Sequence, residues 1–494
     1  MKSAQTLLRS SSYRRIASMV TLALVALFSS VPQLAHAQAT AQVTGTVTDP
    51  SAAIVPGAAV VLKNTGTNAT RTVTVNSDGI YTFSDLQPGS YTVTATSAGF
   101  SPFTADVTVT VGGHFTVDAK LSVTNTATVE VSSDQSAQVN TATAEVSQVI
   151  TQEQVSQLPS LTRNPYDFVA LSGNISSGDA SANGMTQNGA DRGVNFSLNG
   201  QRNSGTEILL DGVENITVFG DAVGTTVPLD AVQEYRVITN NFSPEYGRAS
   251  GGVVAVATKS GTNTLHGTIW EFNRIAATTA NTVTNAQAGT PKGEYTRNQF
   301  GAAVGGPIWK DRLFFFGSAE FTRVRSAASS IGVVPSAELL AASPANVQSF
   351  FSTYGPAVSG TTSSQTTNLQ AGPVDPVTNI QSPLYDPAVY PTLQPGTPVF
   401  NNVSFVAPQD AGGGLPQNTY NVVGRADYTL GQSTQAFFRF VDYHEIDQAG
   451  AAFASPYSQY DVGESNIGQA YLLSVAHEFN QSLTTLSKLS FSRN

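Results

Sequence analysis

The sequence predicts a mainly β protein: an N-terminal β-sandwich, then an α+β domain, then an incomplete transmembrane β-barrel. Three observations lead to this fold class. Many segments of the 494-residue chain alternate apolar and polar side chains, which is the period of a half-buried strand. Only 12% of the residues are charged, against about a quarter in typical soluble domains. The N-terminus also has the features of an export signal.

Residues 1–37 are predicted to be a signal peptide. A basic stretch is followed by an apolar one over residues 16–28. The small residues Ala35 and Ala37 stand at the −3 and −1 positions that a signal peptidase reads, so we expect cleavage between Ala37 and Gln38. The alternative is a membrane anchor, but the apolar stretch is shorter than the ~20 residues that a spanning helix needs.

The composition argues against nucleic-acid binding and against cysteine chemistry. The chain contains no cysteine, so it offers neither a disulfide framework nor a thiolate metal site. Loss of the signal removes four basic residues and no acidic ones, which leaves 20 Lys and Arg against 34 Asp and Glu. Because phosphate-backbone binding requires basic patches, no nucleic-acid partner is expected. A secreted, adhesin-like β-protein would have the same composition.

Residues 38–122 are predicted to form the β-sandwich. About seven short alternating segments recur every ten or so residues, separated by turns such as residues 78–79 and 88–89. The stretch 77–100 resembles the carboxypeptidase regulatory-like, or Cna-B-like, domain. No zinc-ligand pattern accompanies it, so we expect a structural or interaction module. The side chains expected in its core are Tyr81, Phe83, Tyr91 and Val93.

Three motifs between residues 158 and 270 resemble, in order and spacing, the plug domain of Oar-like TonB-dependent outer-membrane receptors. They read LPSLTRNPYDFVALSG from Leu158, VNFSLNGQRNSGTEILLDGVEN from Val194, and VPLDAVQEYRVITNNFSPEYGRASGGVVAVATKSGTNTLHGTIW from Val227. The resemblance implies that residues 158–262 are a plug domain inside a barrel. The motif residues are Asn199, Gly200, Arg202, Asp211, Gly212, Glu245, Tyr246, Gly247, Arg248, Gly251, Gly252, Lys259 and Gly261.

The motifs also predict local structure. Asn199-Gly200 and Asp211-Gly212 suit tight hairpin turns. A proline precedes residues 229–235, which are predicted to start as a helix before the chain continues as a strand. Residues 247–252 are expected to form a small-residue turn, which lets residues 253–257 enter a closely packed central strand.

Residues 123–157 are rich in Thr, Ser, Gln and Val, lack aromatics, and are predicted to be a linker. Within it, Thr126 to Val131 alternates polar and apolar residues, a pattern that can pair with the edge of another protein's sheet. In the receptors that the motifs resemble, this position holds the TonB box. The alternative is the last strand of the sandwich or an edge strand of the plug. The candidate box residues are Thr128, Val129, Glu130 and Val131.

Residues 263–494 are predicted to be the N-terminal part of an outer-membrane β-barrel. Alternation over residues 298–317, 420–430 and 471–479 gives one apolar face, suited to lipid, and one polar face, suited to water or the plug. Residues 326–419 are expected to be one long extracellular loop. The aromatics expected to form interfacial girdles are Trp309, Phe314 and Tyr443.

We predict about seven or eight barrel strands, whereas plugged transporters have about 22. The sequence is therefore expected to be C-terminally truncated.

No catalytic residue, metal site or cofactor is predicted. His444-Glu445 and His477-Glu478 begin a zinc-protease motif, but no histidine follows at the fourth position. Both pairs lie on predicted strands, where residues four apart do not converge as they do on a helix. Asp442 and Glu445 are expected to line a lumen or loop.

The resemblance implies energy-coupled uptake across the outer membrane, with the N-terminal domain and plug facing the periplasm. The expected partners are TonB with its inner-membrane complex, outer-membrane lipid, and an extracellular ligand such as a siderophore, glycan or peptide. The alternatives are a non-transporting outer-membrane adhesin or assembly receptor that uses the sandwich for contact, and a soluble, secreted peptidase accessory.

Overall fold

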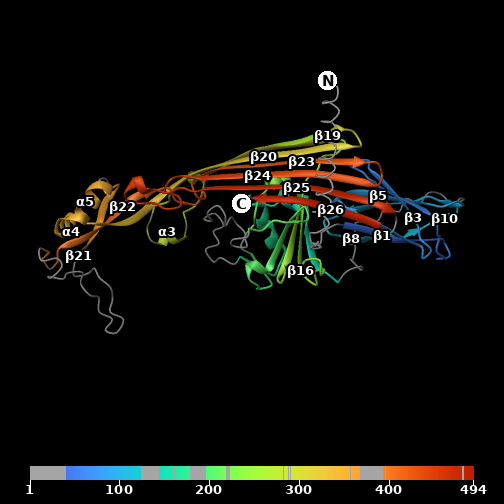
Figure 1. Cartoon of the computed structure of the whole chain (residues 1–494), viewed down its shortest axis with the longest axis horizontal. Coiled ribbons are helices and arrows are strands. Elements are labelled where there is room, and N and C mark those ends of the chain that lie inside the picture. Colours follow the sequence, from blue (N-terminus) through green and yellow to red (C-terminus); the bar gives the residue numbers. More distant parts are fainter. Residues whose placement is uncertain are drawn as a thin grey trace, which may run out of the picture.

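The computed structural model describes residues 41–123, 144–160, 163–177, 196–217, 223–281, 283–287, 289, 291–355, 358–367, 393–394, 396–480 and 483–493. Two predictions lie outside these ranges: the signal peptide with its cleavage site between Ala37 and Gln38, and the candidate TonB box at residues 128–131. In the described part, three β-rich units follow one another along the chain, coloured blue, green and yellow to red in Figure 1. The mainly β fold class is confirmed.

The first unit is the predicted β-sandwich. Its strands are β1 (Ala41–Thr48), β2 (Ala59–Asn64), β3 (Thr70–Thr74), β4 (Ile80–Leu86), β5 (Gly89–Thr96), β6 (Phe100–Ser101), β7 (Phe103–Val109), β8 (His114–Thr116), β9 (Ala119–Lys120) and β10 (Ser122–Val123). One sheet has the order β4-β1-β8 with β9 also paired to β1, the other has the order β3-β2-β5-β7, and β6 pairs with β10. Tyr81 and Phe83 of β4, and Tyr91 and Val93 of β5, are all buried, so both sheets contribute to the core as predicted.

The second unit is a five-stranded sheet that corresponds to the expected plug. Its strands are β11 (Val146–Ile150), β14 (Thr206–Leu210), β15 (Val213–Glu214), β16 (Val232–Asn240) and β17 (Gly252–Thr258). They lie in the order β11-β16-β17-β14-β15. Every residue of β17 is buried, which confirms the central strand expected at residues 253–257. Beside this sheet, β12 (Ile175–Ser177) pairs with β13 (Phe196–Leu198).

The plug sheet begins earlier than its motifs indicate. β11 pairs with β16, and α2 (Gln152–Gln157) follows it with a capping box formed by Thr151 and Gln154. The sequence placed both elements in the linker over residues 123–157. The reason is that β11 is an edge strand with little apolar alternation, and Ile150 is its one fully buried residue.

Two turn predictions have different outcomes. Asp211 and Gly212 both have positive φ and join β14 to β15 as a two-residue hairpin, as predicted. Asn199 and Gly200 also have positive φ, so a tight turn forms there. The hairpin predicted at this turn is wrong, because β13 pairs with the earlier strand β12.

The helix predicted over residues 229–235 is also wrong beyond its first turn. The helical part is a single 3₁₀ turn, η4 (Leu229–Ala231), and β16 starts at Val232. Pairing of β16 with the buried strand β17 overrides the local helix-start signal.

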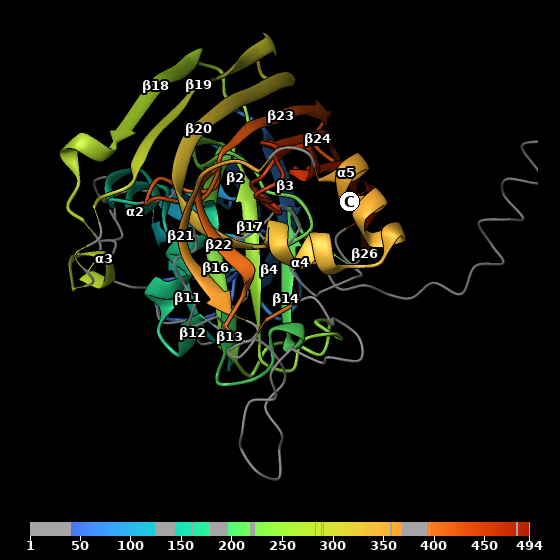
Figure 2. The ribbon, with the colours of Figure 1, turned by 90° about the vertical axis from the view of Figure 1, so that its left-hand side faces the viewer.

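The third unit contains seven long antiparallel strands in the described residues. They are β18 (His266–Ile275), β19 (Glu294–Trp309), β20 (Leu313–Pro335), β23 (Gln417–Leu430), β24 (Thr434–Asp447), β25 (Ser465–Asn480) and β26 (Leu483–Arg493). Their order is β18-β19-β20-β23-β24-β25-β26. Figure 2 shows that they curve around the plug sheet, and we call them the wall.

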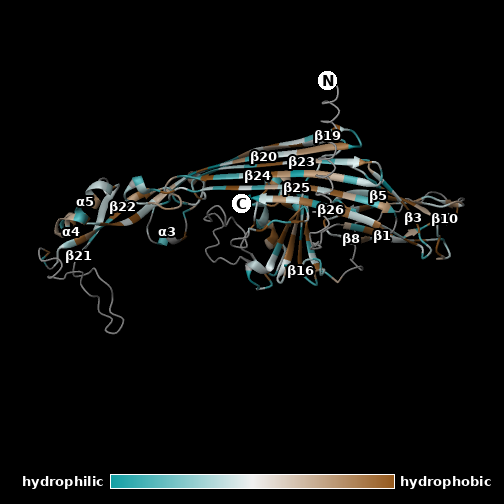
Figure 3. Cartoon of the chain, viewed as in Figure 1, coloured by the Kyte–Doolittle hydropathy of each residue, from teal (hydrophilic) through white to brown (hydrophobic). Residues whose placement is uncertain are grey.

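Side chains of the wall alternate between the plug and the outside, as predicted. In β19, Gln299 and Ala303 are buried, whereas Val304 and Ile308 are 43% and 63% exposed. Figure 3 shows apolar bands interleaved with polar ones along these strands. The outer face is therefore suited to lipid and the inner face to the plug.

The aromatic girdle prediction is wrong for two of its three residues. Trp309 is 56% exposed, but Phe314 and Tyr443 are 1% and 7% exposed. Strand parity explains the difference. Phe314 shares the inner side of β20 with Phe316, and Tyr443 shares the inner side of β24 with Val441, and both of these neighbours pack against the plug core.

The single long loop predicted over residues 326–419 is wrong as well. β20 continues to Pro335, and its second half pairs with one strand of a further antiparallel pair. Together these strands form an extension at the end of the molecule opposite the sandwich in Figure 1. Its elements are α4 (Ala337–Ala342), α5 (Ala345–Tyr354), β21 (Thr361–Thr367) and β22 (Pro398–Ala407). β21 is polar and largely exposed on both faces, so it has no apolar alternation to reveal it.

Short helical segments fill some of the connections. They are η1 (Pro165–Ser172), η3 (Asn203–Gly205), η5 (Ala276–Thr278), α3 (Val283–Gln287) and η6 (Ser458–Tyr460). Across the described ranges, no helix has the length and apolar character needed to span a bilayer.

Candidate functional site

The turn between β14 and β15 lies where the plug sheet meets the wall. Asp211 begins this turn, and its backbone N–H donates to the Val256 carbonyl (2.8 Å). Its carboxylate accepts hydrogen bonds from the Thr258 backbone N–H (2.8 Å) and hydroxyl (2.9 Å). One carboxylate therefore ties the hairpin to the end of the central strand.

Two arginines of the wall approach the same carboxylate. Arg425 of β23 places Nη1 3.5 Å from Asp211 Oδ1, and Arg439 of β24 places Nε 3.1 Å from Oδ2. The side chains of Asp211, Arg425 and Arg439 are 4%, 5% and 2% exposed. Buried ion pairs stabilise a structure when hydrogen bonds also compensate the desolvated charges, and Thr258 does this for Asp211.

Arg425 has partners in all three units. Its Nη1 donates to Thr258 Oγ1 (3.1 Å) in the plug, and its Nη2 donates to Asp427 (2.8 Å) in the wall and to Gln87 Oε1 (2.7 Å) in the sandwich. The guanidinium also lies 4.2 Å from the ring centroid of Phe437. A shift of any one unit relative to the others must therefore break a contact of this side chain.

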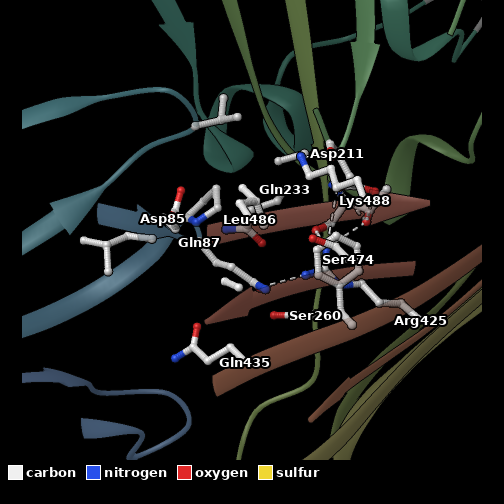
Figure 4. A pocket seen from close by; sticks show the side chains of 17 residues that line it. Asp85, Gln87, Asp211, Gln233, Ser260, Arg425, Gln435, Ser474, Leu486 and Lys488 are labelled. Carbon is white, nitrogen blue, oxygen red and sulfur yellow. Dashed lines mark hydrogen bonds and ion pairs between the residues drawn. The ribbon is translucent and has the colours of Figure 1, made fainter. Parts of the chain in front are cut away.

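A cavity of about 80 Å³ lies at this junction. Figure 4 shows Asp85 and Gln87 of the sandwich on one side, with Asp211, Arg425 and Lys488 on the other. Lys488 Nζ donates to the carbonyl of Asp211 (3.0 Å). Charged and amide side chains line the cavity together with apolar ones such as Phe437 and Leu486. In the described part of the chain, no three potential metal ligands come together.

The sandwich also contacts the plug through Val111, which follows β7. The Val111 N–H donates to the carboxylate of Glu234, and its carbonyl accepts from Arg236 Nη1 (3.3 Å). Arg236 pairs with Glu145 at 2.9 Å. Burial raises the pKa of Glu234 to about 7, against the opposing effects of the Val111 hydrogen bond and of Arg236. This carboxyl group therefore changes charge near neutral pH.

A second set of charges joins the plug to the wall. Arg163 pairs with Asp230 of η4 and places Nη2 3.7 Å from Glu320 of β20. Glu320 also accepts hydrogen bonds from Trp270 Nε1 (3.1 Å) and Gln299 Nε2 (2.8 Å). The plug is thus held by two separate sets of ion pairs.

Several predicted motif residues have definite packing roles. Asn199 Nδ2 donates to the carbonyls of Thr239 (2.6 Å) and Gly251 (3.1 Å), so the turn that it shares with Gly200 is fixed to the plug sheet. Gly251 is crowded too, because a Cβ there would lie 3.1 Å from the Leu198 carbonyl oxygen.

Two further glycines mark close backbone approaches. A Cβ on Gly252 would lie 2.7 Å from the carbonyl oxygen of Ile238 within the plug sheet. A Cβ on Gly261 would lie 2.3 Å from the carbonyl oxygen of Phe315 and 2.7 Å from that of Gly306, both in the wall. The chain therefore leaves the plug through a gap that admits glycine alone.

The remaining motif residues do not gather at the junction. Tyr246 is buried in an apolar cluster that includes Val111. Lys259 is near Asp230, and burial lowers the pKa of its ammonium group. The motif residues on the surface are Arg202, Glu245, Gly247 and Arg248.

The sequence did not reveal the wall side of the junction. The alternation over residues 420–430 predicts a strand that includes Arg425 but indicates no partner for it, and no sequence motif contains Arg439 or Lys488. The sequence does contain a sign that Arg439 has a partner. Arg439 lies between two phenylalanines on a predicted strand, and an arginine that is buried in a fold is usually paired with an acidic group. Gln87 and Val111 lie at the edge of the sandwich and have no such signal.

Comparison with known proteins identifies two of the three units. Residues 42–122 match the model of the carboxypeptidase regulatory-like domain, and residues 257–494 match that of the outer membrane beta barrel domain. The TonB-dependent transporter Oar of Myxococcus xanthus is 32% identical over 134 residues. Part of the chain is therefore similar in sequence to Oar. The aligned part covers 26% of this chain and 12% of Oar.

Solved outer-membrane receptors are similar to this chain at lower identity. The ferric enterobactin receptor PfeA of Pseudomonas aeruginosa is 14% identical with a TM-score of 0.40, covering 71% of this chain and 41% of PfeA. The siderophore receptor PirA of Acinetobacter baumannii is 16% identical with a TM-score of 0.33, covering 70% and 47%. The alcaligin receptor FauA of Bordetella pertussis is 10% identical with a TM-score of 0.40, covering 71% and 39%. The chain spans less than half the length of these receptors.

Proposed function

We propose that this protein is an outer-membrane receptor for TonB-dependent, energy-coupled uptake of a ligand, with the plug as its gate. The observation that carries the proposal is the seating of the plug against the wall. The apolar core of the plug is shared with inward-facing wall residues, and two sets of ion pairs flank it. The shared wall residues are Ala303, Phe316, Val423, Val441 and Ala470.

The connections between wall strands support an orientation. β19 and β20 are joined at residues 310–312, and β23 and β24 at residues 431–433, whereas β20 and β23 are separated by the long extension. Outer-membrane barrels have short periplasmic turns and long extracellular loops. Asn68 of the sandwich contacts Asp311 in one short turn. We therefore place the sandwich and plug on the periplasmic side.

The position of β11 supports a route for force. The linker over residues 124–143 is followed by β11, an edge strand that pairs with β16 alone in the plug sheet. If TonB adds a strand to the candidate box at residues 128–131, tension on the linker reaches β11 first. Peeling an edge strand breaks its hydrogen bonds one after another, which loosens the plug while the wall stays intact.

The test is uptake by cells that express the complete gene. We expect accumulation of at least one member of a panel of radiolabelled ferric siderophores, oligosaccharides and short peptides, and its loss with a protonophore. Deletion of Thr126 to Val131 should abolish accumulation while surface binding persists. Deletion of the six residues Ser132 to Ala137 is the matched control for linker length.

Three results would contradict the proposal. Binding without uptake, unaffected by either deletion, indicates an adhesin or assembly receptor. Equal loss of uptake in both deletions shows that linker length matters and the candidate box does not. Recovery of the protein outside the outer-membrane fraction of a sucrose gradient indicates a secreted accessory protein.

A further inference from the structure

The sandwich is attached to the wall at three separate points near its short-turn end. Asn68 Nδ2 donates to Asp311 Oδ1 (3.0 Å). Arg71 pairs with Glu478 of β25 at 2.6 Å, and the two side chains are 11% and 15% exposed. Gln87 accepts the hydrogen bond from Arg425 described above. These contacts extend from the turn before β20 to β25, so the sandwich is attached to several parts of the wall and not to one turn alone.

Polar contacts dominate this attachment. Each of these three wall contacts is a hydrogen bond or an ion pair between side chains. Toward the plug, Val111 adds one apolar side chain to a cluster with Leu209, Ile238 and Tyr246. The plug, by contrast, shares a large apolar core with the wall. The sandwich is therefore more easily separated from the wall than the plug is.

The sandwich and plug share a partner. Arg425 binds Gln87 of the sandwich with Nη2 while its Nη1 faces Asp211 and Thr258 of the plug. Movement of the plug turn changes the position of this guanidinium, and so weakens the seat of the sandwich. Displacement of the two units is coupled through one side chain.

We propose that the sandwich is a detachable cover over the short-turn end of the barrel, which must leave its seat before material released by the plug enters the periplasm. This rests on the proposed function for its biological use, but the seat itself can be tested without any transported ligand. The ligand-independent probe is potassium chloride, whose passage is measured as conductance across a planar bilayer.

The 494 residues contain no cysteine, so introduced cysteines are the only thiols in this part of the protein. The complete protein is prepared with Asn68→Cys, Asp311→Cys, Arg71→Cys and Glu478→Cys, and the cysteines are joined with a short, reducible bis-thiol reagent. Moderate urea then loosens the plug. We expect the cross-linked protein to conduct several-fold less than the same protein after reduction. Tryptophan fluorescence of the reduced variant that matches wild type in the absence of urea shows that the variant is folded.

The matched control is a cross-link within the sandwich. Thr92 of β5 and Asp106 of β7 are hydrogen-bonded neighbours at 2.7 Å, so Thr92→Cys with Asp106→Cys stiffens the sandwich without fastening it to the wall. Its conductance should match wild type. Equal conductance of the seat-linked protein before and after reduction would overturn the proposal. Failure of uptake by the unmodified protein, with the conductance difference present, would overturn the proposed transport function alone.

Discussion

At the scale of single residues, Asp211 shows how one side chain serves both local and long-range structure. The Asp-Gly pair predicts a hairpin turn, and the structure has it. The same carboxylate also faces Arg425, 214 residues away along the chain. Turn chemistry is local and readable in sequence. The ionic partner depends on how distant strands are placed, which no local pattern encodes.

Replacing Asp211 with Asn tests its ionic role. The amide keeps the shape and an acceptor oxygen for Thr258, but Arg425 and Arg439 lose a buried counter-charge. Breaking a buried pair costs about 3–5 kcal/mol. We expect the urea midpoint for opening of the plug, followed by tryptophan fluorescence or bilayer conductance, to fall clearly. Asp78→Asn, at an exposed turn of the sandwich, is the matched control, and an equal effect from both would refute this role.

At the scale of elements, alternation located most strands, but pairing decided what the other segments became. β16 starts where a helix was expected because β17 offers a buried pairing edge. β20 continues past its expected end because β22 pairs with its exposed, serine-rich second half. Sequence patterns reveal an element when one of its faces is buried. They fail when backbone pairing, and not apolar burial, holds it.

Gly261 follows the end of β17, where the chain passes from the plug to the wall. Gly261→Ala should destabilise the contact between plug and wall by about 1–3 kcal/mol, because the added Cβ meets backbone atoms that cannot rotate away. Gly247→Ala is the control from the same motif, since a Cβ there meets nothing within 4 Å. Urea midpoints of the two variants should differ clearly. If both match wild type, the strand end has room that the structure does not show.

At the scale of the whole molecule, the joint between sandwich and plug should depend on pH. Glu234 lies at this joint beside Arg236, and the facing charged and titratable groups include Glu145, His114 and Glu245. The titratable hydroxyl of Tyr246 also lies near these groups. Because burial raises the pKa of Glu234 from 4.5 to about 7, the docked state holds its proton more tightly than the separated state. Docking is therefore strongest below pH 4.5 and weakens as pH rises through 7.

The measurement is the rate of thiol labelling of Gln87→Cys at pH 5 to 8. This rate is divided by the labelling rate of Ser51→Cys, an exposed reference, because thiol reactivity itself depends on pH. The ratio should rise several-fold across this range. In Glu234→Gln, which keeps an acceptor for the Val111 N–H but cannot ionise, the ratio should stay flat. A rise of the same size in both backgrounds would assign the pH dependence to another group.

Much of the architecture was readable from sequence, whereas the junction between units was not. The sandwich core and the two faces of the wall follow from period-two burial, and the central plug strand follows from its continuous apolar run. The contacts among Gln87, Arg425 and Asp211 join three units, and each residue looks ordinary in its own segment. The girdle prediction failed for Phe314 and Tyr443 because an aromatic near a strand end can face either side, and parity decides which.

The long separations across these junctions have a consequence for biogenesis. Asp211 contacts Lys488, 277 residues later, and Arg71 contacts Glu478, 407 residues later. If the proposed function and orientation hold, a chain exported from its N-terminus brings the sandwich and plug into the periplasm before the wall strands that complete them. The sandwich encloses its own core, but the plug shows a bare apolar face until those strands arrive. Under that proposal the plug needs protection from aggregation until the wall is exported, although it is made before any wall strand.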